Sequence, residues 1–212
     1  MKEALRYTTL FLLCWLSSEA TLAQTSVSGR VLGYVFNRIG DYDGLRLQTT
    51  AGEVQLSFPP HAALGIRRLA RTGQTITADV QPGASGPGPA RPPEARLNRY
   101  RLIRLRNLSS GLVVQVADLP PPQPKSGSLV QAEGPLLKKI QDERGQLIAL
   151  LTDKYLIELK PHQAGQILPL LEGVQRLGVT GFERTAEGFV NQTGRTVLHP
   201  STLTIRGQTF AL

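Results

Sequence analysis

Two stretches of this chain, 101 residues apart, follow the same pattern. Residues 44–61 and residues 145–162 both begin at glycine, turn midway, resume with alternating apolar residues and end in Pro-His. No gap is needed to align them, and a short helix-like stretch and a glycine follow each, Gly73 in one case and Gly173 in the other. Self-similarity at a fixed offset predicts a duplicated structural unit. The alternative is that two ordinary hairpins share one pattern by convergence.

Alternation of apolar and polar residues predicts three strands, a helix over residues 60–71 and two more strands in the first unit. The first strand is expected to have one inward-pointing face, which consists of Val27, Gly29, Val31, Gly33 and Val35. Strands two to four are expected to bury Leu45, Leu47, Thr49, Val54, Leu56, Phe58, Ile76, Ala78 and Val80. A Pro/Gly-rich loop over residues 82–93 precedes a fifth strand near residues 99–107.

The second unit repeats this order. Its strands are expected near residues 129–140, 146–152, 154–160, 174–182 and 203–206, with a helical stretch near 162–171 and a further hairpin at 188–198. Pro169 falls inside the helical stretch, where a proline kinks a helix or starts a fresh turn.

Three strands, a helix and two strands is the element order of the OB-fold, a five-stranded Greek-key barrel. The chain resembles the OB-fold superfamily in this order over most of its length, without a diagnostic motif. The resemblance implies a mainly β protein of two tandem OB-like five-stranded β-barrels, each with one short helix between strands 3 and 4. The expected organisation is a signal peptide (1–23), a first barrel (24–119), a Pro-rich linker (120–127) and a second barrel (128–212). A pair of other small β-barrels is the alternative.

The N-terminus has the three parts of a secretory signal peptide. Lys2 and Arg6 precede an apolar run over residues 8–16, and small residues stand three and one positions before Gln24. A membrane anchor needs roughly 20 apolar residues, about twice this run. A lipoprotein signal is a second alternative, but the residues before Cys14 are bulky. We therefore expect export to the periplasm or the medium, with no membrane span after cleavage.

Cleavage would remove the only Met, Cys and Trp of the chain. The remaining protein would then have no disulfide, no catalytic thiol and no cysteine-ligated metal. The formal net charge of +8 and the pI near 10.1 favour anionic partners such as nucleic acid, acidic polysaccharide or lipid headgroups.

Arginines are concentrated around the predicted fifth strand of the first unit. They are Arg91, Arg96, Arg99, Arg101, Arg104 and Arg106, with Tyr100 among them, and no acidic residue lies between Glu94 and Asp118. The planar arginine fork binds phosphate, sulfate or carboxylate groups, so these residues form a candidate polyanion site. The alternative is a strand edge whose positive charge prevents edge-to-edge aggregation.

The outer faces of strands two and three, where OB-folds usually bind oligonucleotides or oligosaccharides, differ between the units. The first unit presents polar residues, Arg46, Gln48, Thr50 and Gln55, and Arg46 joins the polyanion candidates. The second unit presents an apolar strip, Leu147, Ala149, Leu151 and Leu156. This strip is a candidate interface, either with the first unit and linker or with another exported protein. Neither face carries an aromatic residue for base stacking, which argues against nucleic acid.

Catalytic and metal motifs are not evident. His61 and His162 occupy equivalent positions in the two units, which favours a structural role at a strand-to-helix corner, and His199 is the only other histidine. Three scattered histidines are too few for a histidine-based metal site, and residues 41–44 are interpreted as a turn in preference to a calcium loop. No cofactor is expected.

The leading hypothesis is an exported, non-enzymatic binding or interaction protein. The first alternative is a polyanion or nucleic-acid binder that uses the arginine-rich strand. The second is an enzyme whose residues converge only in three dimensions.

Overall fold

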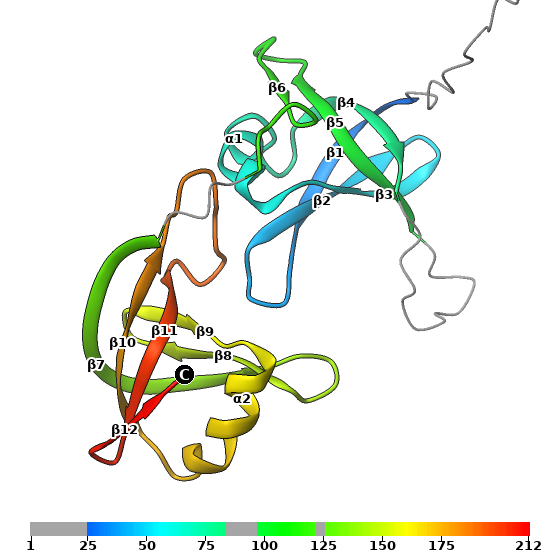
Figure 1. Cartoon of the computed structure of the whole chain (residues 1–212). Helices are drawn as coiled ribbons and strands as arrows, with labels where there is room; N and C mark the ends of the chain where they lie inside the picture. Colours follow the sequence, from blue (N-terminus) through cyan, green and yellow to red (C-terminus); the bar gives the residue numbers. More distant parts are fainter. Residues whose placement is uncertain (1–24, 84–96, 122–125) are drawn as a thin grey trace, which may run out of the picture.

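The computed structural model of the chain describes residues 25–83, 97–121 and 126–212. These residues form two β-barrels in tandem (Figure 1). The predicted fold class is confirmed. The chain is mainly β, with two closed five-stranded barrels and one short helix between the third and fourth strands of each.

The first barrel begins with three antiparallel strands, β1 (Thr25–Phe36), β2 (Tyr42–Thr49) and β3 (Gly52–Ser57). A 3-10 turn, η1 (Pro60–Ala62), and helix α1 (Ala63–Leu69) follow, and then β4 (Thr75–Pro82) and β5 (Asn98–Asn107). A short additional strand, β6 (Val113–Gln115), folds back on β5. Pro60 suits the start of the helical stretch because proline has no N–H to satisfy there and its φ is already helical.

The second barrel repeats the series as β7 (Ser126–Gln141), β8 (Leu147–Thr152), β9 (Tyr155–Glu158), α2 (Pro161–Ile167), η3 (Leu168–Leu171), β10 (Arg176–Arg184) and β11 (Thr196–Ile205). A final strand, β12 (Gln208–Ala211), pairs with β11. The α-helix ends at Ile167 and Pro169 stands in the first turn of η3, as expected of a proline that starts a fresh turn.

Both barrels close through the same pairing. Neighbouring strands are antiparallel, except that β3 pairs in parallel with β5 and β9 pairs in parallel with β11. Each ring therefore runs from the first strand through the second, third, fifth and fourth back to the first. This is the OB-like arrangement that the element order implied.

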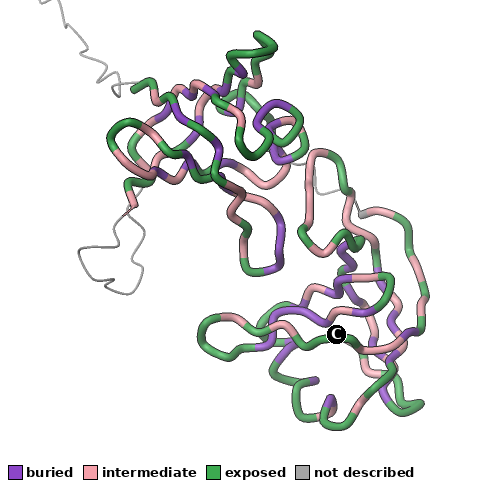
Figure 2. The backbone as a smooth tube through the Cα atoms, turned by 180° about the vertical axis from the view of Figure 1, so that it is seen from behind, coloured by how far each residue is buried: buried purple, intermediate pink, exposed green. Residues whose placement is uncertain are grey.

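Each barrel has its own apolar core, visible as buried segments inside each barrel in Figure 2. The residues predicted to point inward from β2, β3 and β4 all lie in the first core, with the exception of Thr49. The Thr49 hydroxyl instead donates a hydrogen bond to the Gly52 carbonyl oxygen across the β2–β3 turn.

Three local expectations were wrong. The register of β1 against β2 shifts between Val31 and Gly33, so Tyr34 packs against the core in place of Gly33 and Val35. Residues 185–195 are a loop rather than part of a hairpin, and the expected last strand is the end of the longer β11.

Most of the predicted loop at 82–93 lies outside the described residues. Within the described ranges, no helix is long and apolar enough to span a membrane.

Candidate functional site

The outer face of β8 and β9 is covered by the first barrel. Ile39, in the loop between β1 and β2, is only 7% exposed. It belongs to an apolar cluster with residues of β8, β9 and β11, namely Ile148, Ala149, Leu156 and Val197, against which Leu151 packs. Three residues of the predicted apolar strip, Ala149, Leu151 and Leu156, therefore lie together beneath a side chain of the other barrel.

Leu147, the fourth residue of that strip, points the other way. It lies in the core of the second barrel, where it is 2% exposed. The pairing of β7 with β8 shifts register between Ile140 and Gln141, so that Ile148 is inserted without a partner of its own. An inserted residue reverses the inside and outside positions of a strand, which is why simple alternation misplaced Leu147.

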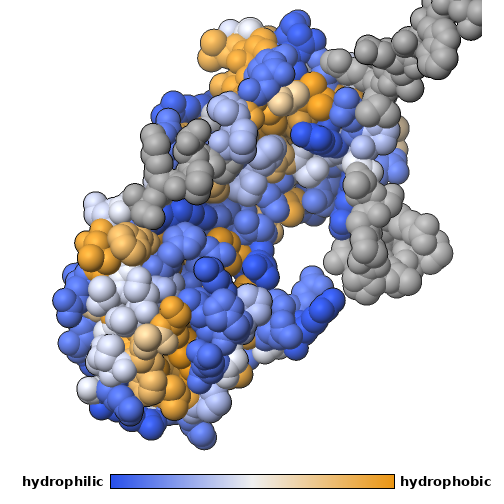
Figure 3. Space-filling view, viewed as in Figure 1, coloured by the Kyte–Doolittle hydropathy of each residue, from blue (hydrophilic) through white to orange (hydrophobic). Residues whose placement is uncertain are grey.

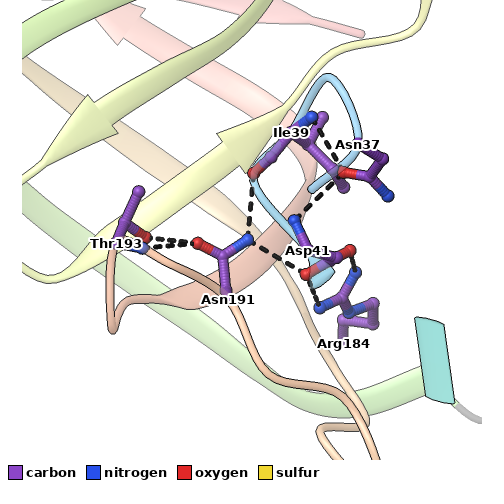
Figure 4. Close-up of polar contacts among 6 residues, drawn as sticks. All are labelled: Asn37, Ile39, Asp41, Arg184, Asn191 and Thr193. Atoms are coloured by element: carbon purple, nitrogen blue, oxygen red, sulfur yellow. Dashed lines mark hydrogen bonds and ion pairs between the residues drawn. The ribbon is translucent and has the colours of Figure 1, made fainter. Parts of the chain in front are cut away.

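A buried ion pair joins the two barrels (Figure 4). Arg184, at the end of β10, donates to both carboxylate oxygens of Asp41 at 2.6 and 2.9 Å. Asn191 donates from Nδ2 to the same carboxylate at 3.0 Å and to the carbonyl oxygen of Ile39 at 2.9 Å. The backbone N–H groups of Ile39 and Asp41 both donate to the Asn37 side chain, which fixes the β1–β2 loop. This set of contacts holds Ile39 in place over the second barrel.

The loop over residues 185–195 connects the second barrel to the first through backbone hydrogen bonds. Its carbonyl groups accept hydrogen bonds from the backbone of the first barrel, Gly188 from Leu64 and Val190 from Tyr42. The guanidinium carbon of Arg184 lies 4.2 Å from the centre of the Phe189 ring, and that ring also lies beside His61. Backbone and side-chain contacts thus act together at the inter-barrel contact, so the outer face of β8 and β9 is not a free surface.

The equivalent face of the first barrel is polar, and no described residue of the second barrel is seen to cover it. Arg46 on β2 stands opposite Gln55 on β3, and Gln55 stands opposite Arg99 on β5. Further along the β3–β5 ladder, but on the same outer face, Ser57 stands opposite Arg101. We call these three strands and their outward side chains the arginine face. All five of these residues are at least partly exposed.

Ion pairs engage only part of the arginine face and its extension along β5. Arg46 contacts Glu53 at 3.2 Å, and Arg104 makes a hydrogen bond of 2.6 Å to Asp79. Arg99, Arg101 and Arg106 are exposed and make no ion pair with any residue of the described ranges. Arg96, the sixth polyanion candidate, and Arg91 lie outside the described residues. The structure thus brings Arg46, Arg99 and Arg101 onto one face and places Arg104 and Arg106 beyond it on the same strand.

The interpretation of the arginine strand as a sheet edge is wrong. β5 pairs with β4 on one side, and on its other side with β3 and then with β6. Both sets of backbone hydrogen-bonding groups are therefore occupied within the barrel. The arginines have no edge to protect from aggregation.

The positive charge of the chain is concentrated in the first barrel. Residues 25–121 contain twelve arginines, no lysine and six acidic residues, which accounts for +6 of the formal net charge of +8. The arginine guanidinium is planar and can form two parallel hydrogen bonds with one anion. A surface whose basic residues are all arginines is therefore suited to sulfate, phosphate or carboxylate groups.

The tyrosines of the first barrel pack against its core. Tyr100 packs against the core, as do Tyr34 and Tyr42. The Arg67 guanidinium lies over the Tyr34 and Tyr42 rings, and the Tyr34 hydroxyl donates to the Ala70 carbonyl oxygen. Burial raises the pKa of Tyr34 well above its ordinary value, which keeps this hydroxyl a donor. Among the described residues, the outer surfaces of β2, β3 and β5 therefore offer no ring for base stacking.

The histidines of the described residues lie apart from one another. His61 lies in η1 with a buried Nε2, and His162 is exposed in the first turn of α2. No group of three or more His, Cys, Asp or Glu side chains in the described ranges is placed to hold a metal ion. Partial burial raises the pKa of Asp43 above its ordinary value, and the neighbouring Asp41 carboxylate adds to this effect.

Comparison with known proteins identifies no family and finds only weak structural similarities. No protein-family model matches the chain, and a search of curated proteins found no match. Among solved structures, it is similar to TiaS in a complex with a tRNA and ATP, with 15% identity over 60% of this chain and 24% of that chain and a TM-score of 0.29. It is also similar to the HINa domain of Ifi202 in complex with double-stranded DNA, with 10% identity over 89% and 95% of the two chains and a TM-score of 0.26. The chain spans 24–33% of the length of the TiaS chains it matches. Likenesses with TM-scores this low carry no inference about function.

Proposed function

We propose that this chain is an exported, non-enzymatic binding protein whose arginine face holds an anionic polysaccharide. The observation that carries the proposal is the contrast between the two barrels. The outer face of β8 and β9 is covered by Ile39, whereas the equivalent face of the first barrel is open and carries Arg99 and Arg101, which make no ion pair within the described ranges. One barrel thus serves as an internal partner, and the other keeps the face that OB-folds use for ligands.

The chemistry of the arginine face favours an acidic polysaccharide over the other anionic polymers. Arg46, Arg99 and Arg101 supply positive charge. The Gln55 amide can donate to and accept from sugar hydroxyls, and the Ser57 hydroxyl, which donates to the Tyr100 carbonyl oxygen, can still accept a hydrogen bond from one. Single-stranded nucleic acid usually gains much of its affinity from stacking on aromatic rings, which this face lacks among the described residues. Docking of another exported protein on β8 and β9 is not supported, because Ile39 already occupies that strip.

The export part of the proposal rests on the first 23 residues. The tripartite pattern favours cleavage before Gln24. Intact mass of the secreted protein tests it. A mature chain that begins at or within a few residues of Gln24 and lacks tryptophan fluorescence supports export with cleavage, and a retained Trp15 contradicts it.

The binding proposal is tested by charge reversal on the arginine face. The Arg99→Glu/Arg101→Glu variant should weaken binding to labelled heparin, measured by fluorescence anisotropy, by at least about tenfold because several counterion-releasing contacts are lost. The control is Arg144→Glu/Arg195→Glu, which makes the same change in net charge at exposed positions of the second barrel. This control should lose less than about threefold. Equal losses in the two variants would show a diffuse effect of net charge and would contradict the proposed site.

A further inference from the structure

An ordered apolar tip projects from the first barrel at the end remote from the second barrel (Figures 1 and 3). It is the turn between β5 and β6, and its apolar side chains Leu108, Leu112 and Val113 are 55%, 59% and 46% exposed. We call these three residues the apolar tip. Exposed apolar side chains gathered at one projecting point mark a contact site more often than scattered ones do.

The turn that carries the apolar tip is held firmly in shape. The Asn107 side chain accepts hydrogen bonds from the backbone N–H groups of Ser109 and Ser110, and the Asn107 backbone bonds to Gly111 and Leu112. From its Nδ2 atom, Asn107 also donates to the carbonyl oxygen of Leu69, the last residue of α1. The apolar side chains of the tip are therefore exposed on a turn whose shape is fixed by hydrogen bonds, one of them to the end of α1.

Arginines surround the base of this turn. Arg106 directly precedes Asn107, and Arg68 directly precedes Leu69, whose carbonyl Asn107 contacts. Gln74 accepts hydrogen bonds both from Asn107 and from the backbone N–H of Arg71, so Arg71 stands beside the turn as well. The Arg106, Arg68 and Arg71 side chains are all exposed.

Acidic residues are missing from the elements that build this end of the barrel. Residues 25–36, 62–78 and 98–117 contain no Asp or Glu. The nearest carboxylate along β4, Asp79, is already paired with Arg104. The tip thus combines an apolar point with an uncompensated positive rim.

We propose that the apolar tip and its arginine rim dock the protein on the surface of an anionic lipid bilayer. A bilayer offers an anionic headgroup layer to the arginines and, just beneath it, an apolar layer to Leu108, Leu112 and Val113. Apolar insertion and electrostatic attraction strengthen each other at such a surface, whereas either alone binds weakly. A narrow projecting tip also fits a deformable lipid surface better than the flat, extended contact typical of protein partners. This site is separate from Arg99 and Arg101, so it does not depend on the proposed polysaccharide face.

Vesicle co-sedimentation tests the proposal directly. The protein used is the chain from Gln24 onward, because the apolar run at residues 8–16 would itself enter a bilayer. It should bind phosphatidylcholine vesicles that contain phosphatidylglycerol and not vesicles of phosphatidylcholine alone. The Leu112→Ser/Val113→Ser variant should lose at least about tenfold in this binding. The control is Leu129→Ser/Phe182→Ser, two exposed apolar residues paired across β7 and β10 of the second barrel, and it should bind as the parent does.

A fluorescent reporter adds a second measurement. Residues 24–212 contain no tryptophan, so Leu112→Trp places a single one in the tip. Its emission should shift to shorter wavelength when anionic vesicles are added. Tip and control variants that bind equally, an unshifted emission, or a concentration-dependent dimer that the tip variant abolishes would each overturn the proposal. Binding of the tip variant to heparin should be unchanged, so failure here is distinguishable from failure of the polysaccharide proposal.

Discussion

The guanidinium of Arg184 in the second barrel donates one hydrogen bond to each carboxylate oxygen of Asp41 in the first barrel, at 2.6 and 2.9 Å. The Asp41 side chain is 2% exposed and that of Arg184 is 18% exposed. Water therefore has little access to the pair, and neither charge can be left without the other at low cost. The ion pair thus links two barrels that each have a core of their own.

Removal of one partner should destabilise the protein strongly. Arg184→Met leaves the Asp41 carboxylate buried and unpaired, for which about 3–5 kcal/mol of unfolding free energy is expected to be lost. Urea unfolding measures this loss. The matched control is Arg176→Met, whose partner Glu133 and own side chain are mostly exposed, and it should cost no more than about 1 kcal/mol. Adding Asp41→Asn to Arg184→Met should restore part of the stability, because the unpaired charge is gone. Similar losses for Arg184→Met and Arg176→Met would contradict a buried role for the pair.

Two glycines of the second barrel separate backbone strain from inter-barrel contact. Gly188 and Gly194 both have left-handed backbones, with φ of +78° and +66°. An alanine at either position should cost about 1–2 kcal/mol for that conformation. A Cβ at Gly188 would in addition overlap the carbonyl oxygen of His61 in the first barrel, whereas a Cβ at Gly194 meets open space. Gly188→Ala should therefore lose clearly more stability in urea than Gly194→Ala, and equal losses would mean that the loop does not rest on His61.

The isolated second barrel should self-associate more than the isolated first barrel. Residues 126–212 without the first barrel would expose Ala149, Leu151 and Leu156, which Ile39 covers in the whole chain. We expect this half to bind a hydrophobic dye and to self-associate, and we expect residues 25–121 to stay monomeric. Leu151→Ser in the isolated half should reduce dye binding. If the isolated second barrel bound less dye and self-associated less than the isolated first barrel, the assigned role of Ile39 would be contradicted.

The order of elements and most of the core follow from sequence because they depend on local periodicity. Alternation alone places Leu45, Leu47, Leu56 and Ile76 inside the first barrel, where the structure has them. Alternation fails where a strand gains a residue, as β8 does at Ile148, because a bulge leaves no clear mark in the pattern.

Contacts between barrels are harder to foresee. In the sequence Asp41 has the character of a turn residue and nothing marks Arg184, since their pairing depends on how two residues 143 positions apart meet. The one available signal is indirect. An apolar strip in the second unit requires a cover, but nothing in the sequence identifies Ile39 as that cover. The arginine face is visible as residue types, whereas the pairing of β5 on both sides becomes clear only from the closed barrel.

The location of ligand binding is the central claim, and amide chemical shifts test it most directly. A titration of the isotopically labelled chain with a heparin oligosaccharide should shift amides of β2, β3 and β5 most, around Arg46, Gln55, Arg99 and Arg101. The chemical shifts of the amides of β8 and β9, beneath Ile39, should not change. The largest shifts on β8 and β9, or no shifts at all at moderate salt, would contradict the claim that the first barrel carries the ligand face.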